Sequence, residues 1–92
     1  QATLDAYARQ IIQATLDAYD ALEPDWSKAP DWAQWYAIDS DGVGYWYGSE
    51  PTFQPLDGAW GAPKREYERQ HDIDDLLGVL ACQLFLWQRP EA

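Results

Sequence analysis

The first part of the chain has apolar residues at the spacing of one helix face. Leu4, Ile11 and Leu22 belong to a set that recurs every three or four positions, with frequent alanines between them. No glycine or proline interrupts the segment before Pro24, which cannot continue a helix. The pattern therefore predicts an amphipathic helix over residues 1–22.

A heptapeptide, QATLDAY, occurs twice in this predicted helix, at residues 1–7 and 13–19. The offset between the copies turns a side chain by about 120° around a helix, so they cannot present the same face to one core. We therefore do not interpret the two copies as a functional repeat.

The middle of the chain has the pattern of a β-hairpin. Residues 33–48 hold two aromatic-rich runs separated by a Ser-Asp-Gly turn, a combination typical of antiparallel strands. Two registers are open. A two-residue loop would pair Ser40 with Val43, whereas a three-residue loop would pair Asp39 with Val43, and the two choices exchange the faces of the strands.

Segments rich in turn-forming residues flank the hairpin. Residues 23–32 contain prolines, acids and two tryptophans, which predicts a linker that folds back onto the core. Residues 49–63 are rich in proline and glycine, so regular structure there should be short. A third, edge strand is expected at Thr52–Gln54 or at Ala59–Trp60.

The C-terminal segment has the apolar spacing of a second helix, over residues 64–88. Its second half is apolar nearly all round, so it needs cover on more than one side. That cover could come from the rest of the chain or from a second subunit, in which case Val79, Phe85 and Leu86 are the candidate dimerisation residues.

These elements predict a single domain over residues 1–92 with an α+β fold. Two helices would pack on one face of a small two- or three-stranded antiparallel sheet, in the order α-β-β-(β)-α.

Composition narrows the class of partner. The 92 residues include 16 acids and 6 bases, a net charge of −10. Phosphate contacts need clustered Lys and Arg, so direct binding to nucleic acid or to an anionic membrane is disfavoured. A protein with a basic surface is the partner that this charge suits, and a homodimer is the other assembly considered.

Residues for catalysis are few. Cys82 and His71 would lie about 16 Å apart along the predicted helix, too far to form a nucleophile and its base. His71 and Asp75 share a helix face, but no second histidine completes a metal site. The sequence therefore predicts no enzyme, no catalytic residues, no metal and no cofactor.

The expected compartment is the cytoplasm. Cys82 is the single cysteine, so no internal disulfide can form, which suits a reducing environment. The longest apolar stretch, residues 76–87, is too short to span a bilayer.

Acidic and aromatic residues concentrate in the same part of the chain. Residues 17–57 hold nine acids against the single base Lys28, together with most of the tryptophans. Exposed rings beside carboxylates are typical of protein interfaces. The candidate partner-binding residues are Asp25, Trp26, Asp31, Trp32, Trp35, Asp41, Tyr45, Trp46 and Tyr47. The alternatives are that the acids only maintain solubility and that the rings only fill the core.

The stretch APDWAQWYAIDSDGVGYWYGSEPTF, Ala29 to Phe53, resembles a pattern in small acidic proteins of tailed bacteriophages and prophages. Its features are a Pro-Asp-Trp-Ala entry, a D-x-D-G turn and an aromatic strand followed by proline. The resemblance implies an inhibitor of the anti-CRISPR type, which binds and blocks a host protein in the bacterial cytoplasm.

Two functions follow as hypotheses. The first is a non-enzymatic phage accessory protein that inhibits a host defence or regulatory complex, using its acidic, aromatic-rich surface against a basic site such as one that holds nucleic acid. The second is a structural or assembly protein that dimerises through the apolar C-terminal helix.

Overall fold

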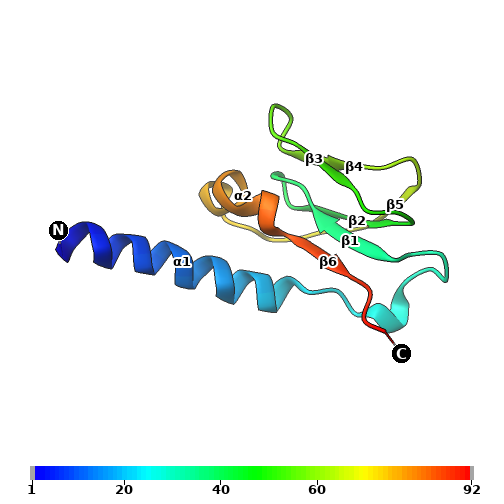
Figure 1. The fold of residues 1–92 in the computed structure, drawn as a ribbon, viewed down its shortest axis with the longest axis horizontal. Helices are drawn as coiled ribbons and strands as arrows, with labels where there is room; N and C mark the ends of the chain where they lie inside the picture. Colours follow the sequence, from blue (N-terminus) through cyan, green and yellow to red (C-terminus); the bar gives the residue numbers. More distant parts are fainter. Residues whose placement is uncertain (1, 92) are drawn as a thin grey trace.

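A computed structural model describes the backbone of residues 2–91 and the side chains of residue 6 and residues 8–91. Gln1 and most side chains of the first heptapeptide copy lie outside this description. A long helix, α1 (Ala2–Leu22), leads through a short 3-10 turn, η1 (Trp26–Lys28), into two small sheets. Figure 1 shows α1 running beside the sheets, with its N-terminal end projecting past the rest of the molecule.

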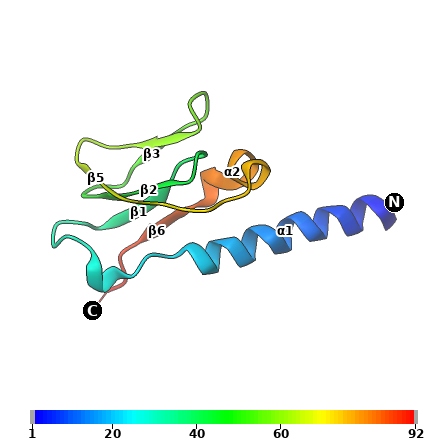
Figure 2. The same cartoon turned by 180° about the vertical axis from the view of Figure 1, so that it is seen from behind.

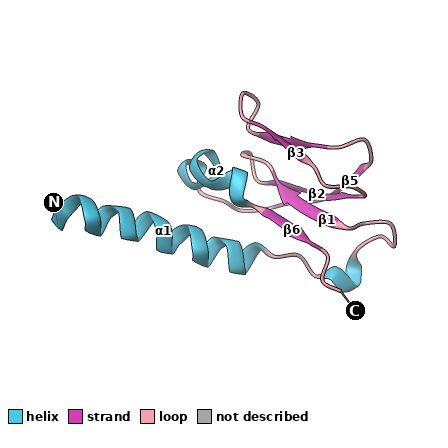
Figure 3. Cartoon of the chain, in the orientation of Figure 1, coloured by secondary structure: helices cyan, strands magenta, loops and turns pink. Residues whose placement is uncertain are grey.

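The larger sheet has four antiparallel strands in the order β5-β2-β1-β6, and the smaller pairs β3 with β4. Figure 3 shows the strands gathered together, with α2 at one end of the larger sheet. The bounds of these elements are β1 (Trp35–Ile38), β2 (Val43–Tyr47), β3 (Thr52–Gln54), β4 (Ala59–Gly61), β5 (Arg65–Gln70), α2 (Asp75–Ala81), η2 (Cys82–Leu84) and β6 (Leu86–Gln88).

The β1–β2 hairpin has the three-residue loop. The Asp39 amide donates to the Val43 carbonyl at 2.9 Å, and the Gly42 amide donates back to the Asp39 carbonyl at 3.0 Å. Gly42 has φ +88°, a backbone conformation that glycine adopts without steric cost. A turn that ends in a residue of this kind matches the right-handed twist of the strands, which selects the three-residue register over the two-residue one.

The predicted helix over residues 64–88 is wrong. Its first third is the edge strand β5, only Asp75–Ala81 form an α-helix, and the end of the segment is β6. β5 is an edge strand of mostly exposed, charged side chains, so it has no apolar alternation that the sequence could show. β6 is a strand because it pairs with β1, with Trp87 opposite Tyr36. Such pairing between distant segments overrides local helical spacing.

The predicted strand count is wrong for the same reason. The described residues form six strands in two sheets, where two or three strands in one sheet were expected. The α+β class is confirmed, and both short segments considered for a third strand are strands, because β3 and β4 pair with each other.

Both faces of the four-stranded sheet are covered. Tyr36, Ile38, Trp46 and Trp87 point to one face and form a core with Phe85 and the helices. The neighbouring residues of the same strands point the opposite way, toward a second cluster that includes Trp60 of β4. Figures 1 and 2 show α1 on one side of this sheet and β3–β4 on the other. The second sheet therefore buries rings that a two-layer fold would leave exposed.

Candidate functional site

The aromatic residues predicted to anchor a partner are buried or half-buried in the protein. Trp46 and Tyr47 are only 4% and 0% exposed, so they are core residues and not surface anchors. Trp26 is half-buried against Trp46, with ring centroids 5.2 Å apart. Trp32 and Tyr45 are also half-buried.

Cations cover two of the half-buried rings. The Lys64 ammonium lies 4.5 Å from the centre of the Trp32 ring, and the Arg65 guanidinium lies 4.3 Å from that of Tyr45. Trp35, the remaining predicted anchor, is half-buried against the second core cluster. These contacts leave less ring surface for a partner than the sequence suggested.

The three predicted acidic residues, Asp25, Asp31 and Asp41, are exposed. Asp25 accepts hydrogen bonds from the Ser27 hydroxyl at 2.6 Å and the Ser27 amide at 3.0 Å, and these bonds lower its pKa. Asp41 accepts from the Val43 amide at 3.0 Å and so supports the hairpin loop. Two of the three acids therefore have a local structural role as well as a charge.

The predicted dimerisation residues do not share one surface. Phe85 is fully buried in the core, Leu86 is half-buried in β6, and only Val79 is well exposed. The continuous apolar helix that was to present them is interrupted after Ala81. Phe85 and Leu86 receive their cover from the chain itself.

An apolar groove lies between α1 and α2, and no sequence argument had located it. The α1/α2 groove has a volume of about 560 Å³. Six exposed aliphatic residues line it: Ile11, Ile12 and Leu16 from α1, and Leu76, Leu80 and Leu84 from α2 and η2. The signal was present as helical spacing on α1, but the sequence could not show that α1 keeps this stripe uncovered.

The groove exists because α1 contacts the body near its C-terminal end. Ala18, Tyr19 and Leu22 pack against the core, and the Tyr19 ring stacks on Trp87 with centroids 4.7 Å apart. The Tyr19 hydroxyl also donates to the Leu86 carbonyl at 3.2 Å. The preceding turns carry their apolar side chains beside α2 without closing onto it.

The single histidine is enclosed and paired with a phenol. His71 is 5% exposed, and its Nε2 is hydrogen-bonded to the Tyr36 hydroxyl. Burial, and secondarily Arg69, lowers the pKa of His71 to about 4, so the ring is neutral at neutral pH. Burial also raises the pKa of Tyr36. A neutral pair shut off from solvent serves packing and not proton transfer to a bound substrate.

A second buried polar group supports the contact between the sheets. Asp39 accepts a hydrogen bond from the Trp60 amide at 2.9 Å, which ties β4 to the β1–β2 hairpin. Burial raises the pKa of this carboxyl, although the hydrogen bond opposes that shift. The hydrogen bond accounts for the placement of Asp39 without a catalytic role.

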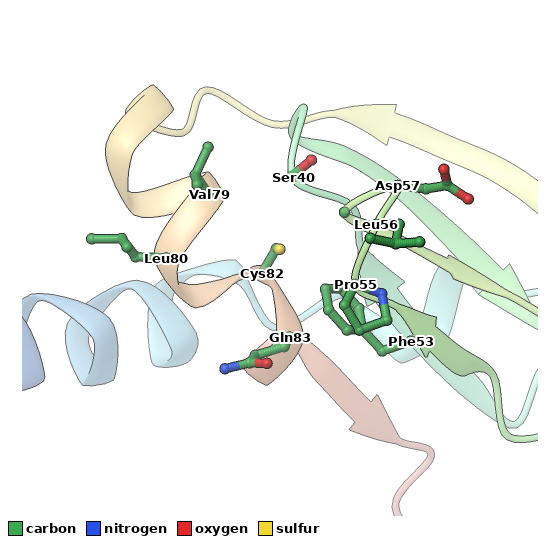
Figure 4. A pocket seen from close by; sticks show the side chains of 10 residues that line it. Ser40, Phe53, Pro55, Leu56, Asp57, Val79, Leu80, Cys82 and Gln83 are labelled. Carbon is green, nitrogen blue, oxygen red and sulfur yellow. The ribbon is translucent and has the colours of Figure 1, made fainter.

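A smaller hollow of about 440 Å³ lies between α2 and the β3–β4 turn (Figure 4). Its lining includes Ser40, Asp57 and Cys82. The Cys82 thiol is buried, and this burial raises its pKa, which makes it a poor nucleophile. Ser40 and Asp57 have no histidine beside them in this lining, so these residues do not form a Ser-His-Asp triad.

Two further observations concern only the described part of the chain. No group of three or more His, Cys, Asp or Glu side chains there is placed to hold a metal ion. No helix there combines the length and the apolar character needed to cross a membrane.

Comparisons with known proteins give no information about the function of this chain. No protein-family model, no curated protein and no solved structure matches this chain.

Proposed function

We propose that this chain is a non-enzymatic protein-binding protein whose partner presents a basic surface. The observation that supports the proposal most strongly is the excess of exposed carboxylates. Among the side chains that the structure describes, thirteen acids are exposed, against five exposed bases. The acids are Asp17, Asp20, Glu23, Asp25, Asp31, Asp41, Glu50, Asp57, Glu66, Asp72, Asp74, Asp75 and Glu91, and the bases are Arg9, Lys28, Lys64, Arg65 and Arg69.

Two of the five bases are already engaged with rings. Lys64 lies over Trp32 and Arg65 lies over Tyr45. The field around the molecule is therefore dominated by carboxylates, which attracts a positively charged partner and repels nucleic acid and other acidic proteins. The resemblance to phage proteins suggests that this partner belongs to a bacterial host, and inhibition of a host complex stays a prediction.

Affinity capture from a bacterial lysate at low and high ionic strength tests the proposal. We expect captured proteins to be basic and to be released by salt, because screening weakens attraction between exposed charges. Asp25→Asn, Asp31→Asn and Asp41→Asn together should weaken capture. Asparagine keeps the side-chain oxygen that accepts from Ser27 and Val43, so this variant removes charge without removing those hydrogen bonds.

The matched control carries Glu50→Gln, Asp57→Asn and Glu66→Gln. These three residues are exposed, and the change in net charge is the same. Weaker capture by the first variant alone places the partner near Asp25, Asp31 and Asp41. Equal weakening by both variants supports general charge attraction, and capture that salt does not affect contradicts the proposal.

A second candidate function is an assembly protein that associates with itself. The observation that favours it is the row of exposed aliphatic residues in the α1/α2 groove, and not the predicted apolar helix. Light scattering separates the two functions, because self-assembly requires a stable oligomer of the isolated chain.

A further inference from the structure

The α1/α2 groove has the surface properties of an interface without its partner. Ile12 and Leu16 are 59% and 55% exposed, and Leu76, Leu80 and Leu84 are all more than half exposed. Leu76, Leu80 and Leu84 follow one another at intervals of four residues, and so do Ile12 and Leu16. The two walls of the groove therefore present aliphatic side chains at helical spacing.

The groove itself carries negative charge. Asp74 is the one charged residue of its described lining, which includes no Lys or Arg. Arg9 is the one base on α1, and the segment from Asp75 to Leu84 contains no Lys or Arg. The groove is thus an apolar surface with one carboxylate in its lining, on a molecule with a net charge of −10.

We propose that the α1/α2 groove binds a basic amphipathic helix of the partner, an inference that rests on the proposed function. A helix can place apolar residues at positions i, i+3, i+4 and i+7 against the aliphatic floor. Lysines or arginines beside those residues then lie near Asp74 and in the negative field of the whole molecule. This occupant satisfies the apolar and the charged parts of the surface together.

Charge argues against a second copy of the chain as the occupant. A symmetric dimer uses the same patch on both subunits, so it would bring two negatively charged molecules together. Each copy has a net charge of −10. The exposed aliphatic residues favour association, but the like charges oppose it, whereas a basic helix meets no such penalty.

The probe is a synthetic peptide of leucine and lysine with leucines at the helical spacing given above. Its binding is measured by fluorescence anisotropy of a label on the peptide. One control peptide has glutamate in place of lysine, and another has the same composition in shuffled order. We expect saturable binding of the amphipathic Leu/Lys peptide and much weaker binding of both controls.

The groove variant carries Ile12→Ser and Leu76→Ser. Both side chains are more than half exposed, so the fold should tolerate the changes, which circular dichroism checks. The matched control carries Leu56→Ser and Val79→Ser, two exposed aliphatic residues that do not line this groove. Because two apolar contacts are lost, the groove variant should raise the Kd of the Leu/Lys peptide about tenfold or more. The control should leave it nearly unchanged.

Two results would overturn the inference. Equal peptide binding by the groove variant and the control would show that the peptide is held by general charge attraction. A dimer of the isolated chain that the groove variant dissociates, seen by sedimentation velocity, would identify a second copy as the occupant. If the groove variant fails to fold, Leu84→Ser provides the same comparison at another exposed lining residue.

The proposed function can survive the failure of this inference. If the groove variant still captures basic proteins in a salt-sensitive way, only the assignment of the groove is wrong. If the unmodified chain shows no salt-sensitive capture, the proposed function itself is wrong.

Discussion

At the scale of single residues, the core is held by aromatic rings and a few buried polar groups. The Tyr36 ring contacts Trp46, Trp87 and His71, with centroids 4.8, 5.9 and 6.0 Å apart. The indole nitrogens of Trp26 and Trp87 are buried and have no hydrogen-bond partner among the described residues. Packing of these large rings outweighs the cost of an unsatisfied donor, about 1–3 kcal/mol each.

The enclosed His71 predicts a loss of stability in mild acid. Burial lowers its pKa from 6.5 to about 4, so between these values the unfolded chain binds a proton that the folded chain does not. The contribution of His71 to the free energy of unfolding is therefore fully present above pH 6.5 and should fall by about 3 kcal/mol as the pH drops to 4. Urea unfolding across this range measures the effect.

His71→Gln is the control for that prediction. The variant lacks the titrating ring, so its stability should change less between pH 6.5 and pH 4. The carboxyls, including Asp39 with its raised pKa, are common to both proteins, so their titration largely cancels in the comparison. Identical pH profiles of the two proteins would show that His71 does not carry the effect.

Gly44 occupies a position where the surrounding atoms leave no room for a methyl group. A Cβ there would collide with the hydroxyl of Tyr36 and lie 2.9 Å from His71 Nε2. Both side chains are buried and cannot move aside, so Gly44→Ala should cost about 2–3 kcal/mol in chemical denaturation. At Gly48 the nearest atom would be 3.5 Å away, so Gly48→Ala should be nearly neutral. Equal costs at the two positions would contradict this explanation.

At the scale of elements, α1 depends on a small attachment. It is 21 residues long, yet its described contacts with the core come from Ala18, Tyr19 and Leu22. Most helical stability in proteins comes from packing an apolar face, and Ile11, Ile12 and Leu16 on this face of α1 are exposed. The structure therefore makes α1 the element whose stability depends most on a few contacts.

Tyr19→Ala should release α1 from the body. The change removes the stack on Trp87 and the hydrogen bond to Leu86, at a cost of about 2 kcal/mol. Amide hydrogen exchange should accelerate across α1 and stay slow in β1 and β2. Tyr19→Phe keeps the stack and should have a smaller effect. Unchanged exchange in α1 of the alanine variant would show that other contacts hold the helix.

At the scale of the whole molecule, like charges surround a small body. The extents are 48 × 31 × 20 Å, and the net charge is −10. Carboxylates at this density repel one another more strongly in the folded state than in the expanded chain. The same charge on which the proposed function depends therefore lowers stability.

Salt should stabilise this protein. Screening of the repulsion should raise the free energy of unfolding on the order of 1 kcal/mol, or roughly 5 °C in Tm, between low and moderate sodium chloride. Thermal melts followed by circular dichroism measure the shift. The variant with Asp25→Asn, Asp31→Asn and Asp41→Asn should respond less to salt. A Tm that falls with added sodium chloride would rule out net repulsion.

The sequence alone determined the local features of this protein. Helical spacing without glycine or proline predicted α1, because that spacing is a property of the segment itself. The Asp-Gly turn between aromatic runs predicted the β1–β2 hairpin, because Gly42 can adopt a positive φ. The net charge of −10 also followed from composition, because it depends on no contact between residues.

The tertiary structure alone decided the remaining features, because they depend on contacts between distant segments. β5 and β6 are strands through pairing with β2 and β1, although their local pattern favoured a helix. The β3–β4 sheet covers Tyr47, and the core buries Trp46 and Phe85. Two predicted partner-binding residues and one predicted dimerisation residue are therefore not at the surface. The α1/α2 groove could not be predicted either. The spacing of apolar residues shows that a helix has an apolar face, but it does not show whether the rest of the chain covers that face.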